Sequence, residues 1–127
     1  MGMQTQAQAR DVVERYYSAF DAHTEEWKDL VTDDVVFDGP VQHARGRAEF
    51  IGLTGQFLQA HRETRLLGRM ANGNQVASVF EFAIVAPNGE QVTCSVAEWA
   101  TVVDGRIKEF RVYYDPRAFV RAFGTGD

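Results

Sequence analysis

At 127 residues the chain has the length of one ordinary domain, and 45% apolar with 12% aromatic residues suffice for a hydrophobic core. A formal net charge of −5 argues against nucleic acid as a partner, because the arginines are scattered instead of forming a basic stripe. The N-terminus has no apolar signal region and no stretch approaches the roughly 18 apolar residues that cross a bilayer, so we expect a soluble, cytoplasmic protein without membrane association.

The single cysteine, Cys94, excludes an intrachain disulfide, in agreement with a reducing compartment. We expect it to be a small buried side chain and not a nucleophile, because no histidine lies near it in the sequence. His23, His43 and His61 are spaced unlike any metal motif, so the sequence predicts neither a metal site nor a cofactor.

The first predicted element is an amphipathic helix from about residue 6 to residue 22. Thr5 and Gln8 form a capping-box pattern at its start. A buried tyrosine needs a partner for its hydroxyl, so either Tyr16 or Tyr17 is expected to bond in the core or to point into a cavity. The apolar stripe of this helix, at helical spacing, is Ala9, Val13, Tyr16 and Phe20.

A second, short helix is predicted to start at Thr24, followed by a strand over residues 34–38 that Gly39-Pro40 ends. Asp38 is a candidate acid at the end of that strand. The alternative is a turn residue placed before Gly-Pro.

The remaining elements are a helix over residues 48–60, strands over about 64–71 and 75–86, a long hairpin, and a terminal helix capped by Asp115. This order predicts an α+β fold in which a curved antiparallel sheet wraps around three helices as a cone-shaped barrel with an internal pocket. We expect one domain over residues 1–127, with residues 1–5 and 124–127 frayed.

The hairpin over residues 91–119 decides whether Glu98 faces inward. A two-residue loop at Asp104-Gly105 would place Glu98 opposite Arg111, and a three-residue loop would place it opposite Phe110. We favour the second register because it collects apolar side chains on one face, where Glu98 becomes a carboxylate on an apolar wall. That face carries Cys94, Val96, Ala100, Phe110, Val112 and Tyr114.

The preceding hairpin turns at Asn88-Gly89, the strongest short signal for a two-residue loop. That loop would place Val79 opposite Glu98 and Glu81 on the same face as Glu98, at about 7 Å between Cβ atoms. The alternative is that either glutamate faces solvent at a sheet edge or pairs with an arginine.

These registers predict a pocket for a small hydrophobic molecule. Its polar groups would be Tyr16, Glu81 and Glu98, while in the alternative interpretation the aromatic side chains simply fill the core. The predicted lining is Tyr17, Phe37, Val79, Val96, Phe110, Val112 and Tyr114.

The opposite face of the sheet would be an uncovered apolar patch, which predicts a homodimer. Packing of this patch under the terminal segment is the alternative. The predicted patch consists of Phe80, Phe82, Ile84, Ala97, Trp99 and Tyr113.

Four segments, RYY at 15–17, DDVVFDGP at 33–40, GRAEF at 46–50 and DGRIKEFRVYYDP at 104–116, resemble the SnoaL-like branch of the nuclear transport factor 2-like superfamily. The resemblance spans almost the whole chain. It implies a conical pocket that relatives use as isomerases, cyclases, epoxide hydrolases, dehydratases or binders.

In ketosteroid isomerase-like relatives, a helix-one tyrosine and an acid on the penultimate strand form the oxyanion hole, and Tyr16 and Glu98 resemble those positions. The general base of that group would fall at Gly39, with Asp38 one residue early. In SnoaL-like cyclases an acid-base aspartate resembles Glu98, while Phe110 and Val112 replace polar residues of the last strand.

Limonene epoxide hydrolase is similar around Pro87-Asn88-Gly89, and its catalytic aspartate in the earlier strand lines up with Glu81. Its other catalytic side chains line up with Val79, Val112, Phe37 and Gly39, so most of that machinery is missing. The resemblance therefore implies acid-base chemistry by Glu81 and Glu98, with Tyr16 nearby. A non-catalytic binder of a lipophilic ligand, or a scaffold domain, is the alternative.

Overall fold

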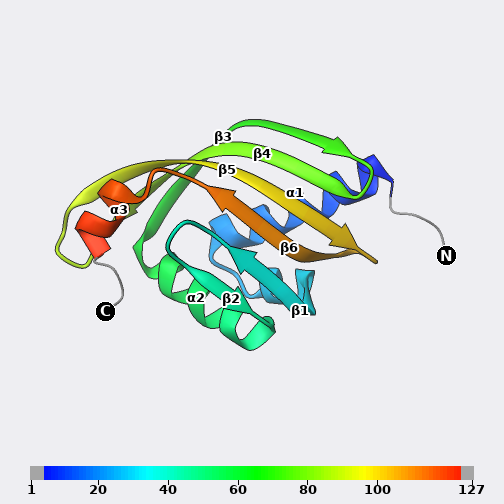
Figure 1. Ribbon diagram of the computed structural model, residues 1–127, viewed down its shortest axis with the longest axis horizontal. Helices are drawn as coiled ribbons and strands as arrows, with labels where there is room; N and C mark the ends of the chain where they lie inside the picture. The colour runs from blue at the N-terminus through cyan, green and yellow to red at the C-terminus, as the bar shows by residue number, and fades with distance from the viewer. Residues whose placement is uncertain (1–4, 124–127) are drawn as a thin grey trace.

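A computed structural model describes residues 5–123, and over this range the chain forms an α+β fold with a curved, unclosed sheet (Figure 1). The helices are α1 (Gln6–Ala22), the short 3₁₀ helix η1 (Glu26–Leu30), α2 (Arg47–Ala60) and α3 (Pro116–Phe123). The strands are β1 (Val31–Asp38), β2 (His43–Arg45), β3 (His61–Asn72), β4 (Gln75–Val85), β5 (Gln91–Val103) and β6 (Arg106–Tyr113).

The six strands lie in the order β2-β1-β6-β5-β4-β3, with every neighbouring pair antiparallel except β1 and β6. Helix α1 packs against β3, β4, β5 and β6, and α2 packs against β1, β2 and β3. The core lies between these helices and the sheet. The predicted α+β fold is confirmed, while the sequence missed the short strand β2 and the parallel pairing of β1 with β6.

The predicted ends of the helices agree with the structure where capping residues define them. The Thr5 hydroxyl accepts from the Gln8 amide at 3.0 Å, and the Gln8 side chain accepts from the Thr5 amide at 2.9 Å, so the capping box is present. Asp115 accepts from the Arg117 amide at 3.0 Å at the start of α3. Fraying was predicted for residues 1–5 and 124–127, and all of these except Thr5, which caps α1, lie outside the described residues.

The predicted register of the β4–β5 hairpin is wrong by one residue. The Ala86 amide donates to the Glu90 carbonyl at 2.8 Å, so residues 87–89 form a three-residue loop in which Gly89 has φ +87°. Ser78 therefore lies opposite Glu98, and Glu81 lies opposite Ser95. A one-residue shift moves every side chain of a strand to the other face, so Glu81 and Val79 leave the concave face of the sheet.

The β5–β6 hairpin has a two-residue loop, so the favoured three-residue loop is wrong. Asp104 and Gly105 both have positive φ, 51° and 80°, and Val103 pairs with Arg106. A bulge then adds Lys108 to β6, because Val102 pairs with Ile107 and Thr101 with Glu109. Glu98 consequently lies opposite Val112, two residues from the predicted partner, and it still faces inward.

The outer face of the sheet also differs from the prediction. Phe80, Phe82 and Ile84 are buried against the helices, because the β4 register is shifted. Exposed apolar side chains of this face include Val79, Trp99 and Tyr113, at 45%, 39% and 58% exposure.

Candidate functional site

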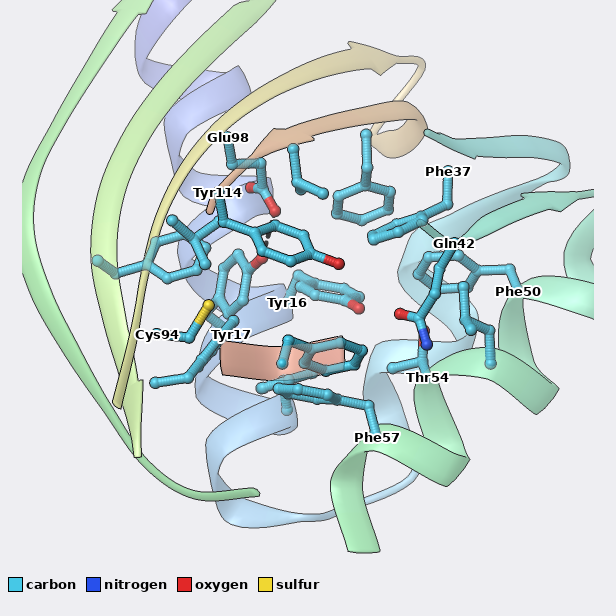
Figure 2. A pocket seen from close by; sticks show the side chains of 18 residues that line it. Tyr16, Tyr17, Phe37, Gln42, Phe50, Thr54, Phe57, Cys94, Glu98 and Tyr114 are labelled. Carbon is cyan, nitrogen blue, oxygen red and sulfur yellow. Dashed lines mark hydrogen bonds between the residues drawn. The ribbon is translucent and has the colours of Figure 1, made fainter. Parts of the chain in front are cut away.

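A cavity of about 90 Å³ lies on the concave side of the sheet, and most of its walls are aromatic (Figure 2). The sequence predicted eight of its lining residues: Tyr16, Tyr17, Phe37, Val96, Glu98, Phe110, Val112 and Tyr114. Ten more complete the lining: Phe20, Gln42, Phe50, Leu53, Thr54, Phe57, Phe80, Phe82, Cys94 and Phe119.

Glu98 is the one carboxyl group among the lining residues, and only 4% of this residue is exposed. The Tyr17 hydroxyl donates a hydrogen bond to Oε2 of Glu98, as the dashed line in Figure 2 marks. The other oxygen, Oε1, is buried and has no hydrogen-bond partner within the described residues. Because an unpaired buried oxygen is costly, Oε1 is the atom of this pocket that a ligand would satisfy.

Burial raises the pKa of Glu98 from its ordinary value of 4.5 to about 7. The hydrogen bond from Tyr17, followed by the positive charge of Arg69, pulls that pKa partly back down. At neutral pH the protonated and ionised forms of Glu98 are therefore both well populated. A group of this kind can give up a proton and take one back without a large free-energy cost.

Tyr16 and Tyr17 come from consecutive positions of α1, and their rings meet edge to face at 4.9 Å between centroids. Burial, followed by the nearby charge of Glu98, raises the pKa of each tyrosine well above 10. A hydrogen bond with Thr54 lowers the pKa of Tyr16 in part. Both hydroxyls therefore stay protonated at neutral pH, so they act as hydrogen-bond donors and not as bases.

Arg69 of β3 lies over the ring of Tyr17 and does not line the cavity. Its guanidinium carbon lies 5.7 Å from the centre of the Tyr17 ring, and its Nε donates to the Ser78 hydroxyl at 2.8 Å. Ser78 pairs with Arg69 on one side and with Glu98 on the other. Arg69, Ser78 and Glu98 thus form one row across three neighbouring strands.

A second polar cluster surrounds the buried His61 beside the cavity, at the start of β3. Nδ1 of His61 lies 3.1 Å from Nε2 of His23, and Nε2 of His61 lies 2.8 Å from the Thr64 hydroxyl. The Thr64 hydroxyl in turn donates to Asp21 at 2.5 Å. Burial, followed by the charge of His23, lowers the pKa of His61 to about 4. His61 is therefore neutral at physiological pH and acts in packing, with its ring against Phe20 and Phe82.

Three predicted site residues lie outside the cavity. Glu81 pairs with Arg65 at 3.1 Å on the outer face, so the predicted carboxyl pair with Glu98 does not form. Val79 faces solvent on the same side. Asp38 is half-buried and contacts Nδ1 of His43 at 2.6 Å, because these two residues face each other across β1 and β2.

Sequence reasoning missed three kinds of lining residue. The alternation of apolar residues in β4 could be seen in the sequence, but the register error assigned Phe80 and Phe82 to the outer face instead of the cavity. Thr54 of α2 lies on the same helix face as Phe50, at i+4, which is a usable signal. Gln42 lies in the connection between β1 and β2, and no periodic pattern marks it.

Comparison with known proteins identifies the family. The sequence matches the SnoaL-like domain over residues 13–110, which is most of the chain. The chain belongs to the SnoaL-like family. No curated protein sequence matches it significantly.

Solved structures share the NTF2-like fold of this SnoaL-like chain. A candidate SnoaL-like polyketide cyclase from Jannaschia sp. CCS1 superimposes with a TM-score of 0.80 at 17% identity, covering 100% of this chain and 99% of its own. A candidate ketosteroid isomerase from Kribbella flavida gives 0.75 at 18% identity, covering 87% and 79%. A candidate polyketide cyclase from Xanthomonas campestris gives 0.74 at 22% identity, covering 92% and 97%.

Across residues 5–123, no group of three or more histidine, cysteine or acidic side chains is arranged to hold a metal ion. Over the same range, no helix is both long and apolar enough to cross a bilayer.

Proposed function

We propose that this SnoaL-like chain is an acid-base enzyme that moves a proton on a small hydrophobic substrate, with Glu98 as its catalytic residue. The observation that carries the proposal is the unpaired, buried Oε1 atom of Glu98 in an aromatic cavity. The pKa of about 7 supports it, because a carboxyl group that titrates near neutral pH suits general acid-base work.

In the proposed reaction, Oε1 of ionised Glu98 removes a proton from the carbon next to a carbonyl group. The electron pair of that C–H bond forms a C=C bond, and the π pair of the carbonyl group moves onto its oxygen and gives an enolate. Protonated Glu98 then returns the proton to a carbon of the same molecule. Isomerisation and aldol-type cyclisation both begin with formation of the enolate. The structural neighbours named above include a candidate ketosteroid isomerase and candidate polyketide cyclases.

The side chains around Glu98 support a division of roles. The Tyr17 hydroxyl donates to Oε2 and so holds the carboxyl group with Oε1 turned toward the substrate. Tyr16 keeps its proton at neutral pH and would donate to the developing enolate oxygen. Epoxide opening of the limonene epoxide hydrolase kind is less well supported, because Glu81, its counterpart acid, lies outside the cavity.

Hydrogen–deuterium exchange tests the proposal before any natural substrate is known. Cyclohexanone, 1-indanone and 2-tetralone are incubated with the protein in D₂O, and loss of the α-proton signals is followed by NMR. We expect exchange above the buffer rate with at least one ketone, loss of that exchange in Glu98→Gln, and retention in the matched control Glu81→Gln. Ketone binding without exchange would instead support the non-catalytic binder, in which Glu98 only orients the ligand.

A further inference from the structure

Gln42 is a polar group of the cavity to which the proposed proton transfer gives no role. Figure 2 shows its side-chain amide directed into the cavity from the connection between β1 and β2. The backbone carbonyl of Gln42 accepts from the Gly39 amide at 3.0 Å, while the side-chain amide has no hydrogen-bond partner among residues 5–123. An amide that can both donate and accept is therefore free to bind a ligand.

Two contacts hold the connection that carries Gln42 in place. Asp38 and His43 pair across its base, with 2.6 Å between Oδ1 and Nδ1. Gly39 lies against the floor of the cavity, where an added Cβ would come within 3.0 Å of Val112 Cγ2. A side chain at position 39 would push Val112 or the connection aside by a few tenths of an ångström, so Asp38 and Gly39 act as positioning residues for Gln42.

Gln42 and Glu98 approach the cavity from different parts of the sheet. Strand β6 lies between β5, which carries Glu98, and β1, which precedes Gln42, so strand spacing separates the backbones of β1 and β5 by about 10 Å. The walls between them are aromatic, with the Phe50 and Phe110 rings stacked at 5.1 Å between centroids. The cavity thus presents the Gln42 amide and the Glu98 carboxyl group from two different sides of a largely aromatic wall.

We propose that Gln42 is a specificity-determining residue that selects ring compounds with a second polar group, a carbonyl or hydroxyl, placed across the ring from the group that meets Glu98. This inference rests on the proposed function and extends it from a small hydrophobic substrate to one with two polar ends. A ligand with an apolar far end leaves the Gln42 amide covered and unpaired, which lowers its affinity.

Two phenols of similar shape test the selection. 4-Hydroxyacetophenone and 4-ethylphenol differ at the far end of the ring by a carbonyl oxygen, and their dissociation constants are measured at pH 6 by NMR titration of ¹⁵N-labelled protein. We expect the ratio of the two constants to favour the ketone in the wild type and to fall about fivefold in Gln42→Leu, the effect of one neutral hydrogen bond. Asp38→Ala should lower the ratio in part, whereas Asp38→Asn, which can still pair with His43, should preserve more of it.

The outcomes separate this inference from the proposed function. If both phenols bind near Glu98 and Gln42→Leu leaves the ratio unchanged, Gln42 does not select the ligand and the inference fails alone. If neither phenol shifts a resonance of the cavity while Glu98 still catalyses ketone exchange, the selection of a ligand with two polar groups is refuted and the proposed function is not. Absence of both binding and exchange refutes the inference and the proposed function together.

Discussion

The raised pKa of Glu98 predicts that this side chain destabilises the folded protein as the pH rises from about 4.5 to 7. Its pKa is 4.5 in an unfolded chain and about 7 in the cavity. Well below pH 4.5 the carboxyl group is protonated in both the folded and the unfolded state, so its titration does not change the free energy of unfolding. As the pH rises to 7 the unfolded state loses the proton first, and stability falls by about 3 kcal/mol, since each pKa unit corresponds to about 1.4 kcal/mol.

Replacement of Glu98 by glutamine removes this dependence, because the amide is neutral at every pH and its oxygen can still accept from Tyr17. We therefore expect Glu98→Gln to gain about 3 kcal/mol of unfolding free energy relative to the wild type between pH 4.5 and pH 8. Urea denaturation at fixed protein concentration across this range measures the difference. The common contribution of other titrating groups, His61 among them, cancels in the comparison.

The matched control is Glu63→Gln, which changes an exposed glutamate of β3. Its difference from the wild type should stay flat across the same pH range. A difference for Glu98→Gln that is equally flat would refute the reasoning, because Glu98 would then have the same pKa folded and unfolded.

Three further predictions concern groups around the cavity and on the outer face. Arg69→Met should raise the pKa of Glu98, because the arginine charge lowers it, and a shift of the exchange-rate profile toward higher pH would check this. His61 should lower the stability of the folded protein as the pH falls from about 6.5 toward 4, because the unfolded side chain takes up a proton that the folded one resists. This contribution opposes that of Glu98, so His61→Gln should gain unfolding free energy relative to the wild type over this range in urea denaturation. We also propose a homodimer through Val79, Trp99 and Tyr113, so sedimentation at micromolar concentration should show about twice 14.3 kDa and Trp99→Arg should give the monomer. A monomeric wild type at every concentration would contradict the dimer.

The parts of the fold that local patterns determine could be predicted from the sequence. The Thr5–Gln8 capping box and the apolar stripe of α1 placed Tyr16 and Tyr17 on the cavity because helical spacing leaves little choice. The inward face of β5 was also predicted, although through an incorrect pairing. The Lys108 bulge adds one residue to β6 and so restores the alternation that the two-residue loop would otherwise have reversed.

The errors arose where the local sequence permits two geometries. Asn88-Gly89 fits both a two-residue loop and a three-residue loop with Gly89 at positive φ, and the choice between them decides the face of Glu81. Gln42 could not be predicted at all. Its position depends on contacts between distant segments, such as Gly39 against Val112, which no local pattern encodes.

Carbon-13 NMR titration of the Glu98 side-chain carboxyl, assigned by its loss in Glu98→Gln, tests the central claim most directly. We predict a midpoint near pH 7, which moves when 4-hydroxyacetophenone is added because the ligand reaches Oε1. A midpoint near the ordinary value of 4.5 that does not respond to any cavity ligand would contradict the account.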